Sequence, residues 1–294
     1  MSKTARYSAV GDVVEVGAGL EGKFRVGQRV AIAGAGLANH AELNTVPENL
    51  CAPVPDDVND EEACFGTLGA IAMNGVRLLE PQLGDVIAVI GAGLVGQLAA
   101  QFADLAGCRV VVLDYNDERL KLAAYGGAEL TYNLGDGDPV AAIMDLSGGR
   151  GCDGVVIAAA TDSSEPFDTA AAIARDKGTI SLVGITGTEF DYRAFMKKEL
   201  SVVVSPHLFL TRIEPLSSPV PSFESLAKVT VTVAGAQCGR NENAPSITSL
   251  PAESRMYQCA GSGLFCLKLL WLAKLSTLPE PADAHVTLWT SGAV

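Results

Sequence analysis

Basic residues are scarce in this chain of 294 residues, which has 21 Lys and Arg against 34 Asp and Glu and a formal net charge of −13. Nucleic-acid binding depends on Lys and Arg that neutralise phosphates, so this deficit disfavours a nucleic-acid partner. Long apolar runs are also missing. No stretch reaches the roughly 18 residues of a membrane span, and the first ten residues lack the apolar core of a signal peptide. We therefore expect a cytoplasmic protein.

Closely spaced cysteines are absent as well, because the seven cysteines are scattered without a Cys-x-x-Cys pair. An odd number of dispersed cysteines does not fit a closed disulfide framework, so reduced thiols are the simplest interpretation. Cys51 and Cys64 occupy apolar positions, and we expect both to be small core residues.

The composition of the chain changes near residue 205. Residues 1–204 hold 28 acidic and 15 basic residues, whereas residues 205–294 hold six of each, with eight of the 14 prolines and five of the 31 glycines. Turn chemistry therefore differs between the two parts. We place a domain boundary here and leave residues 205–294 as an unassigned tail.

Three glycine-rich segments raise the question of a nucleotide site: GAGLEG (17–22), GAGLAN (34–39) and GAGLVG (91–96). A G-x-G-x-x-G pattern binds a dinucleotide only where a strand runs into it and a helix starts from it. The first two segments are each followed by sequence that predicts another strand. We interpret them as turns of a β-barrel.

The third segment stands in the required context. The apolar run VIAVI (86–90) precedes it as a buried parallel strand, and RVVVL (109–113) predicts a second strand that ends at Asp114, 18 residues beyond Gly96. Asp114 would accept hydrogen bonds from the adenosine ribose and repel a 2′-phosphate, so NAD is favoured over NADP. The intervening helix places four large side chains at helical spacing on one face, namely Leu94, Leu98, Phe102 and Leu105.

Each residue of the turn has a physical task. Gly91 permits the tight turn, Gly93 lets the backbone approach the pyrophosphate, and Gly96 allows close packing of helix and strand. Leu94 and Val95 begin the helix, whose unpaired N–H groups and partial positive charge favour the pyrophosphate. A glycine turn without a ligand is the alternative interpretation.

Strands and helices continue to alternate up to residue 204, which predicts an α/β fold with a Rossmann doubly wound parallel sheet. AAAT (158–161) and GITG (184–187) follow two predicted strands and should line the nicotinamide side. The further predicted helices are 118–128, 139–149 and 165–176, and the further predicted strands are 129–134, 154–160, 179–185 and 200–204.

The sequence resembles the medium-chain dehydrogenase/reductase superfamily, which includes zinc-dependent alcohol and polyol dehydrogenases and zinc-free quinone reductases. Three segments within residues 9–204 carry the resemblance: GDVVEVGAGLEGKFRVGQRVAIAG, PENLCAPVPDDVNDEEACFGTLGAIAMNGVR, and LGDVIAVIGAGLVGQ with the residues that follow. The resemblance implies part of a GroES-like β-barrel catalytic domain in residues 1–50, a connecting segment and helix in 51–83, and a Rossmann NAD-binding domain in 84–204. It also suggests Arg119 as an adenosine-side contact, with an ordinary surface arginine as the alternative.

Zinc ligands are not evident in the sequence. In zinc-dependent members of the superfamily, a cysteine and a Gly-His-Glu motif precede the first residue that matches here, so the resemblance implies that these ligands belong to a region this chain lacks. Polyol-type members have an acidic ligand where this chain has Thr67. A catalytic zinc needs three protein ligands, and His40 is the only histidine before residue 205. We predict that no metal is bound. We expect the His40 side chain either to be hydrogen-bonded within the protein or to be exposed to solvent.

Two functions are consistent with these observations. The first is an NAD-dependent oxidoreductase that transfers a hydride between an alcohol or sugar-like substrate and the nicotinamide. The alternative is an NAD-binding fragment or pseudoenzyme without turnover. The sequence assigns no catalytic residue. The expected partner is a small-molecule alcohol or sugar-like substrate, with no nucleic acid and no membrane. Association with a second copy of the chain, as a homo-oligomer, is left open.

Overall fold

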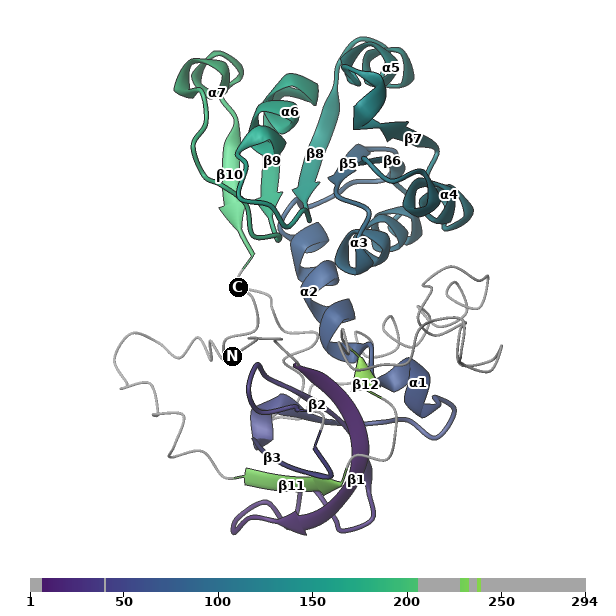
Figure 1. The fold of residues 1–294 in the computed structure, drawn as a ribbon, viewed down its shortest axis with the longest axis vertical. Helices are drawn as coiled ribbons and strands as arrows, with labels where there is room; N and C mark the ends of the chain where they lie inside the picture. The colour runs from purple at the N-terminus through teal and green to yellow at the C-terminus, as the bar shows by residue number, and fades with distance from the viewer. Residues whose placement is uncertain (1–6, 40, 206–227, 233–236, 239–294) are drawn as a thin grey trace. The chain divides into compact units, whose positions relative to one another are not determined.

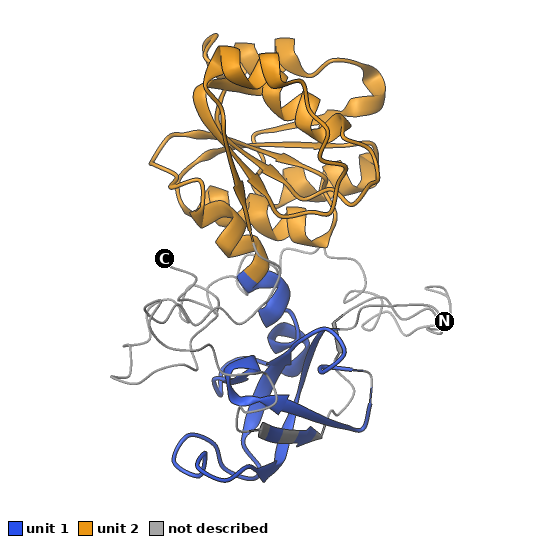
Figure 2. Cartoon of the chain, turned by 90° about the vertical axis from the view of Figure 1, so that its left-hand side faces the viewer, with its two compact units in different colours: residues 1–70, 208–257, 270–294 blue, residues 71–207, 258–269 orange. Residues whose placement is uncertain are grey.

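A computed structural model describes residues 7–39, 41–205, 228–232 and 237–238. The chain forms two compact units, coloured blue and orange in Figure 2. Unit 1 contains residues 1–70, 208–257 and 270–294, and unit 2 contains residues 71–207 and 258–269. The first boundary between them falls inside helix α2 (Gly66–Arg77), ahead of the boundary at residue 84 expected from the sequence.

Unit 1 is built on an antiparallel sheet (Figure 1). Its main strand order is β3-β11-β1-β2-β4, and β12 pairs with β1. GAGLEG lies between the antiparallel strands β1 and β2, as expected for a barrel turn. The elements are β1 (Ser8–Val16), β2 (Arg29–Ala33), β3 (Leu43–Pro47), η1 (Glu48–Leu50), β4 (Cys51–Pro53), α1 (Asp60–Ala63), β11 (Lys228–Thr232) and β12 (Gln237–Cys238).

Strand β11 is an element that the sequence analysis did not assign. It lies between β1 and β3 and pairs with both, so a segment of the predicted tail belongs to the antiparallel sheet. Val229 and Val231 are both 0% exposed and pack in the core of unit 1 with Val13, Val30 and Val46.

Unit 2 is the predicted Rossmann fold, with six parallel strands in the order β10-β9-β8-β5-β6-β7. This is the doubly wound order, and it reverses direction between β5 and β8. Its elements are β5 (Val86–Ile90), α3 (Leu94–Leu105), β6 (Arg109–Asp114), α4 (Asp117–Tyr125), β7 (Leu130–Asn133), η2 (Leu134–Asp136), α5 (Val140–Leu146), β8 (Cys152–Ile157), α6 (Glu165–Ile173), β9 (Ala174–Leu182), α7 (Tyr192–Lys198) and β10 (Ser201–Val204).

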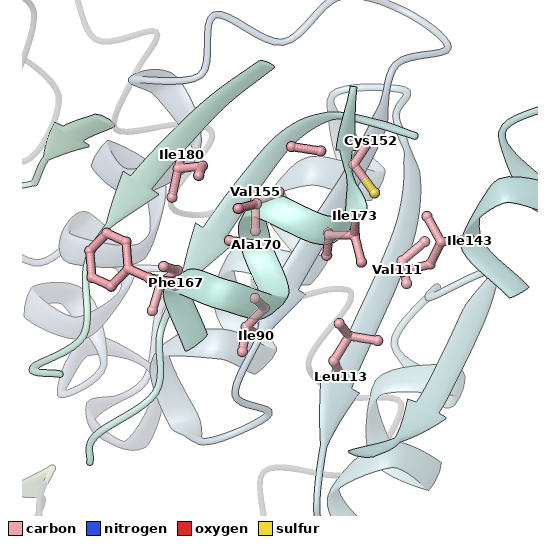
Figure 3. Packing of buried hydrophobic residues seen from close by; sticks show 14 of the residues in the cluster. Ile90, Val111, Leu113, Ile143, Cys152, Val155, Phe167, Ala170, Ile173 and Ile180 are labelled. Carbon is pink, nitrogen blue, oxygen red and sulfur yellow. The ribbon is translucent and has the colours of Figure 1, made fainter. Parts of the chain in front are cut away.

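One face of the parallel sheet carries a continuous apolar core (Figure 3). Ile90, Leu113 and Ile157 from three neighbouring strands pack with Ile143 of α5 and Phe167 of α6. Every residue of β5 is buried, which confirms that VIAVI is a strand covered on both faces. Because the cluster contains no residue of α3, and α3 contacts β5 and β6, this helix covers the opposite face.

The buried face of α3 differs from the prediction. Leu98 is buried, but Leu105 is 55% exposed, and small residues cover much of the buried surface. Gly96, Ala99 and Ala103 are all buried. At Gly96 the reason is the close approach of the helix start to the glycine turn, because a Cβ there would overlap the Gly91 carbonyl oxygen.

The end of α6 also lies earlier than predicted. The helix stops at Ile173, and residues 174–176, expected to be helical, belong to β9. Lys177 has a positive φ of 59°, and the register of β9 against β8 shifts beside it. A bulge of this kind adds residues to the strand and interrupts its alternation of buried and exposed side chains. The sequence pattern therefore did not show that the strand begins at residue 174.

Candidate functional site

The glycine turn joins the carboxyl end of β5 to the start of α3, at the edge where the strand order reverses. The Gly91 N–H donates to the Leu113 carbonyl at 2.7 Å, which ties the turn to β6. Gly91 has a φ of 96°, a conformation that favours glycine, and a Cβ there would lie 2.8 Å from the Ala159 nitrogen. The structure therefore gives a backbone reason for glycine at this position.

Gly93 and Gly96 have different surroundings. A Cβ on Gly96 would overlap the carbonyl oxygen of Gly91, so close packing excludes any larger residue. A Cβ on Gly93 would meet no protein atom within 4 Å, and its φ of −69° is open to any residue. Protein packing does not explain glycine at position 93, and the missing side chain leaves the backbone open to a ligand.

Helix α3 begins directly after Gly93, so Leu94 and Val95 are its first two residues. The first N–H groups of a helix have no partner within the helix, and the helix dipole adds a partial positive charge there. The N-cap residue, Gly93, supplies no side-chain cap. The turn thus presents backbone donors suited to a phosphate group.

Asp114 ends β6 beside this turn, and its side chain is only 10% exposed. One carboxylate oxygen accepts a hydrogen bond from the Ala92 N–H at 2.6 Å, and the other accepts one from the Asn116 N–H at 2.9 Å. A carboxylate has about four acceptor positions. Asp114 therefore holds the turn and retains capacity for hydroxyl donors.

Arg119 lies in the first turn of α4, with its guanidinium 3.8 Å from Asp114 and its side chain 51% exposed. The structure brings the two predicted adenosine-side residues together. Only the arginine side of this pair is exposed to solvent, and its guanidinium lies at the surface beside the turn.

Gln97 is a residue of this site that the sequence analysis missed. Its side-chain amide donates to the Ala92 carbonyl at 3.2 Å and to the Arg119 carbonyl at 2.8 Å, and the residue is 3% exposed. One feature of the sequence could have identified Gln97. It is a polar residue directly after the third glycine, on a helix that was expected to bury apolar side chains.

The two segments predicted to line the nicotinamide side also meet. Ala160 and Ile185 form a parallel bridge beyond the ends of β8 and β9, and the Thr161 N–H donates to the Ile185 carbonyl at 2.9 Å. The Thr186 Oγ1 atom is buried and has no hydrogen-bond partner among the described residues. A hydroxyl is thus available at this edge of the sheet.

The residues considered as metal ligands do not come together in the part of the chain that the structure describes. Cys51 and Cys64 are buried free thiols, as expected of core residues, and burial raises the pKa of the Cys51 thiol. Thr67 is buried with its hydroxyl unpaired, and His40 lies outside the described residues. No three His, Cys, Asp or Glu side chains within the described ranges form a group that could hold a metal ion.

No helix among the described residues combines the length and the apolar character needed to cross a membrane.

Comparisons with known proteins agree with this architecture. Residues 95–210 match a family model described as zinc-binding dehydrogenase. The chain is 32% identical over 205 residues to a probable alcohol dehydrogenase of Mycobacterium tuberculosis, in a match that covers 65% of this chain and 55% of the relative. The chain thus spans about half the length of the curated relatives it matches.

Two solved structures with bound nucleotides are similar. A mycobacterial protein complexed with NADPH matches with a TM-score of 0.58 and 26% identity, covering 67% of this chain and 62% of the other. A protein from E. coli CFT073, described as a short chain alcohol dehydrogenase and complexed with NADH, matches with a TM-score of 0.57 and 26% identity, covering 67% and 66%. Similar folds therefore accompany both cofactors.

Proposed function

This chain belongs to the medium-chain dehydrogenase/reductase superfamily, and from that premise we propose that it is an oxidoreductase that binds NAD at the turn from Gly91 to Gly96. The observation that carries the proposal is the position of this turn, which joins the carboxyl end of β5 to the start of α3 where the strand order reverses, with Asp114 beside it and open space at Gly93. Leu94 and Val95 would donate backbone N–H groups to the pyrophosphate at the start of α3.

Asp114 supports the choice of NAD over NADP. Its carboxylate lies beside the turn, and a 2′-phosphate brought close to it would be repelled. Arg119 lies 3.8 Å away and could attract a phosphate, but Asp114 is nearly buried and hydrogen-bonded in place, whereas Arg119 is half exposed. The fixed negative charge therefore dominates the adenosine side.

The proposed reaction is hydride transfer between the nicotinamide of the bound cofactor and an alcohol or sugar-like substrate. The cofactor supplies the redox chemistry, and the protein binds and orients the reactants. Residues 158–161 and 184–187 would stand beside the nicotinamide, since ligands of doubly wound folds lie beyond the carboxyl ends of the strands. No proton carrier is assigned. Because no metal-binding group occurs among the described residues, no step is assigned to zinc.

A second candidate function is NAD binding without turnover. It is favoured by the residues present, since the described residues include the glycine turn and Asp114 of the proposed cofactor site but no cluster of potential metal ligands. The two candidates share the nucleotide site and differ only in the reaction.

Calorimetric titration with NADH, followed by an assay of NAD⁺ reduction with a panel of primary alcohols, secondary alcohols and polyols, distinguishes the candidates. NADH binding with alcohol-dependent absorbance of NADH supports the dehydrogenase. Binding without any turnover supports the second candidate. Failure to bind either NADH or NADPH contradicts both.

A further inference from the structure

Gln97 makes two hydrogen bonds, one buried and one partly buried, that link the glycine turn to the start of α4. Its Nε2 donates to the Ala92 carbonyl within the glycine turn and to the Arg119 carbonyl in the first turn of α4. The residue is 3% exposed and directly follows Gly96. A primary amide carries two N–H groups, so one nitrogen can serve both carbonyls.

These bonds fix the orientation of a peptide unit. In a trans peptide, the C=O and the next N–H point in opposite directions. Holding the Ala92 carbonyl toward Gln97 therefore turns the Gly93 N–H away from Gln97. Asp114 holds the preceding peptide through the Ala92 N–H. Two successive peptides of the turn are thus each fixed by one buried side chain, from α3 and from β6.

We infer that Gln97 is a positioning residue, which holds the Ala92–Gly93 peptide and the Arg119 backbone in the arrangement that accepts the nucleotide. The inference rests on the proposed nucleotide site and names a residue on which its shape depends. Gln97 itself does not need to touch the ligand. Its loss should release the turn and the first turn of α4 together, and so change both affinity and the choice between NADH and NADPH.

Gln101 provides a matched control on the same helix. It is also buried, at 6% exposure, and its Nε2 donates to the Gln97 carbonyl at 3.3 Å. Its Oε1 has no partner among the described residues. Gln101→Met and Gln97→Met therefore remove the same chemical group from neighbouring turns of α3, but only Gln97→Met removes a bond to the glycine turn.

The test combines two measurements on the full chain. Amide hydrogen exchange of the nucleotide-free protein should accelerate in peptides covering 91–96 and 116–120 for Gln97→Met but not for Gln101→Met. Fluorescence titration should show NADH affinity falling about tenfold in Gln97→Met, with a smaller NADH-to-NADPH preference, and staying within about twofold in Gln101→Met.

Unchanged exchange and affinity in Gln97→Met would overturn the inference, as would equal effects of the two variants. The exchange measurement needs no ligand, so it decides the positioning role even if the wild-type protein binds no nucleotide. In that case accelerated exchange confined to Gln97→Met would retain the inference about the turn, while the proposed function would fail.

Discussion

Gly93 and Gly96 are three positions apart, yet the reasons for glycine at the two positions are different. A Cβ on Gly96 would enter the Gly91 carbonyl oxygen, which belongs to the backbone and cannot move aside cheaply. A Cβ on Gly93 would enter open space, at a backbone conformation that alanine adopts readily. One glycine is required by the fold, whereas protein packing does not require the other, which lies where we propose that the ligand approaches the backbone.

Alanine substitutions separate these two requirements. Gly96→Ala should lower the free energy of unfolding by about 1–3 kcal/mol, because the new methyl group overlaps the turn. Gly93→Ala should change the free energy of unfolding by less than about 1 kcal/mol, since restriction of the unfolded chain is offset by the lower preference of alanine for the N-cap position. It should nevertheless weaken NADH binding at least about tenfold. Thermal unfolding and NADH titration of both variants provide the measurement.

The reverse pattern would contradict this account of the turn. If Gly93→Ala bound NADH as the wild-type protein does, the open space beside it would not be the pyrophosphate site. Gly96→Ala with unchanged stability would show that the close approach of α3 to the turn is not required.

At the level of single residues, the sequence indicated some of the residues that the structure places together. The glycine spacing and Asp114 could be proposed because the tasks expected of them demand particular residue types at a fixed separation. Gln97 was not found, because its role depends on carbonyl groups at residues 92 and 119 that only the folded chain brings together. A buried glutamine on a helix has no sequence signal that names its partners.

At the scale of elements, the alternation of strand and helix patterns in the sequence predicted the order of the elements. It did not predict how closely they pack. The predicted strands and helices of unit 2 follow the expected order, because each carries its own periodic pattern. Helix α7 (Tyr192–Lys198) was not predicted. The buried face of α3 was misjudged, since small residues form much of it and the close approach of the helix start to the turn excludes a larger side chain at Gly96. Strand β11 has an alternating sequence, KVTVT, but it is short and lies among prolines and glycines, so its pairing with β1 and β3 was not predicted.

Strand β11 gives a prediction of its own. Val231 is 0% exposed in the core of unit 1, so Val231→Asp should lower the free energy of unfolding of that unit by about 3–5 kcal/mol, because the new charge is buried without a partner. Hydrogen exchange in β1 and β3 during urea titration reports on unit 1 directly. Peptides from β5 and β6 report on unit 2 and should change little.

Val204→Asp is the control for this prediction. Val204 lies in β10 at the edge of the parallel sheet and is 66% exposed, so its replacement should have little effect on either unit. If Val231→Asp were as mild as Val204→Asp, β11 would not contribute to the stability of the antiparallel sheet.

At the scale of the whole molecule, the relation to zinc enzymes makes metal content informative. We predict that the purified protein holds far less than one zinc per chain, because the described residues contain no group of potential metal ligands. Chelators should then leave its melting temperature unchanged, whereas they would lower the melting temperature of a protein stabilised by structural zinc. Elemental analysis together with thermal unfolding in the presence and absence of a chelator provides the measurement.

Zinc near one equivalent per chain would refute this prediction. Substitutions at His40, Cys51 and Cys64 would then identify the ligands, with loss of bound zinc as the readout.

The central claim is that the turn from Gly91 to Gly96, with Asp114 beside it, binds NAD in preference to NADP. Titration of the wild-type protein with NADH and with NADPH, followed by nicotinamide fluorescence, tests it most directly. We predict that NADH binds at least about tenfold more tightly, because the fixed carboxylate of Asp114 repels the 2′-phosphate. Equal affinities, or tighter binding of NADPH, would contradict the assignment of Asp114 and the choice of cofactor.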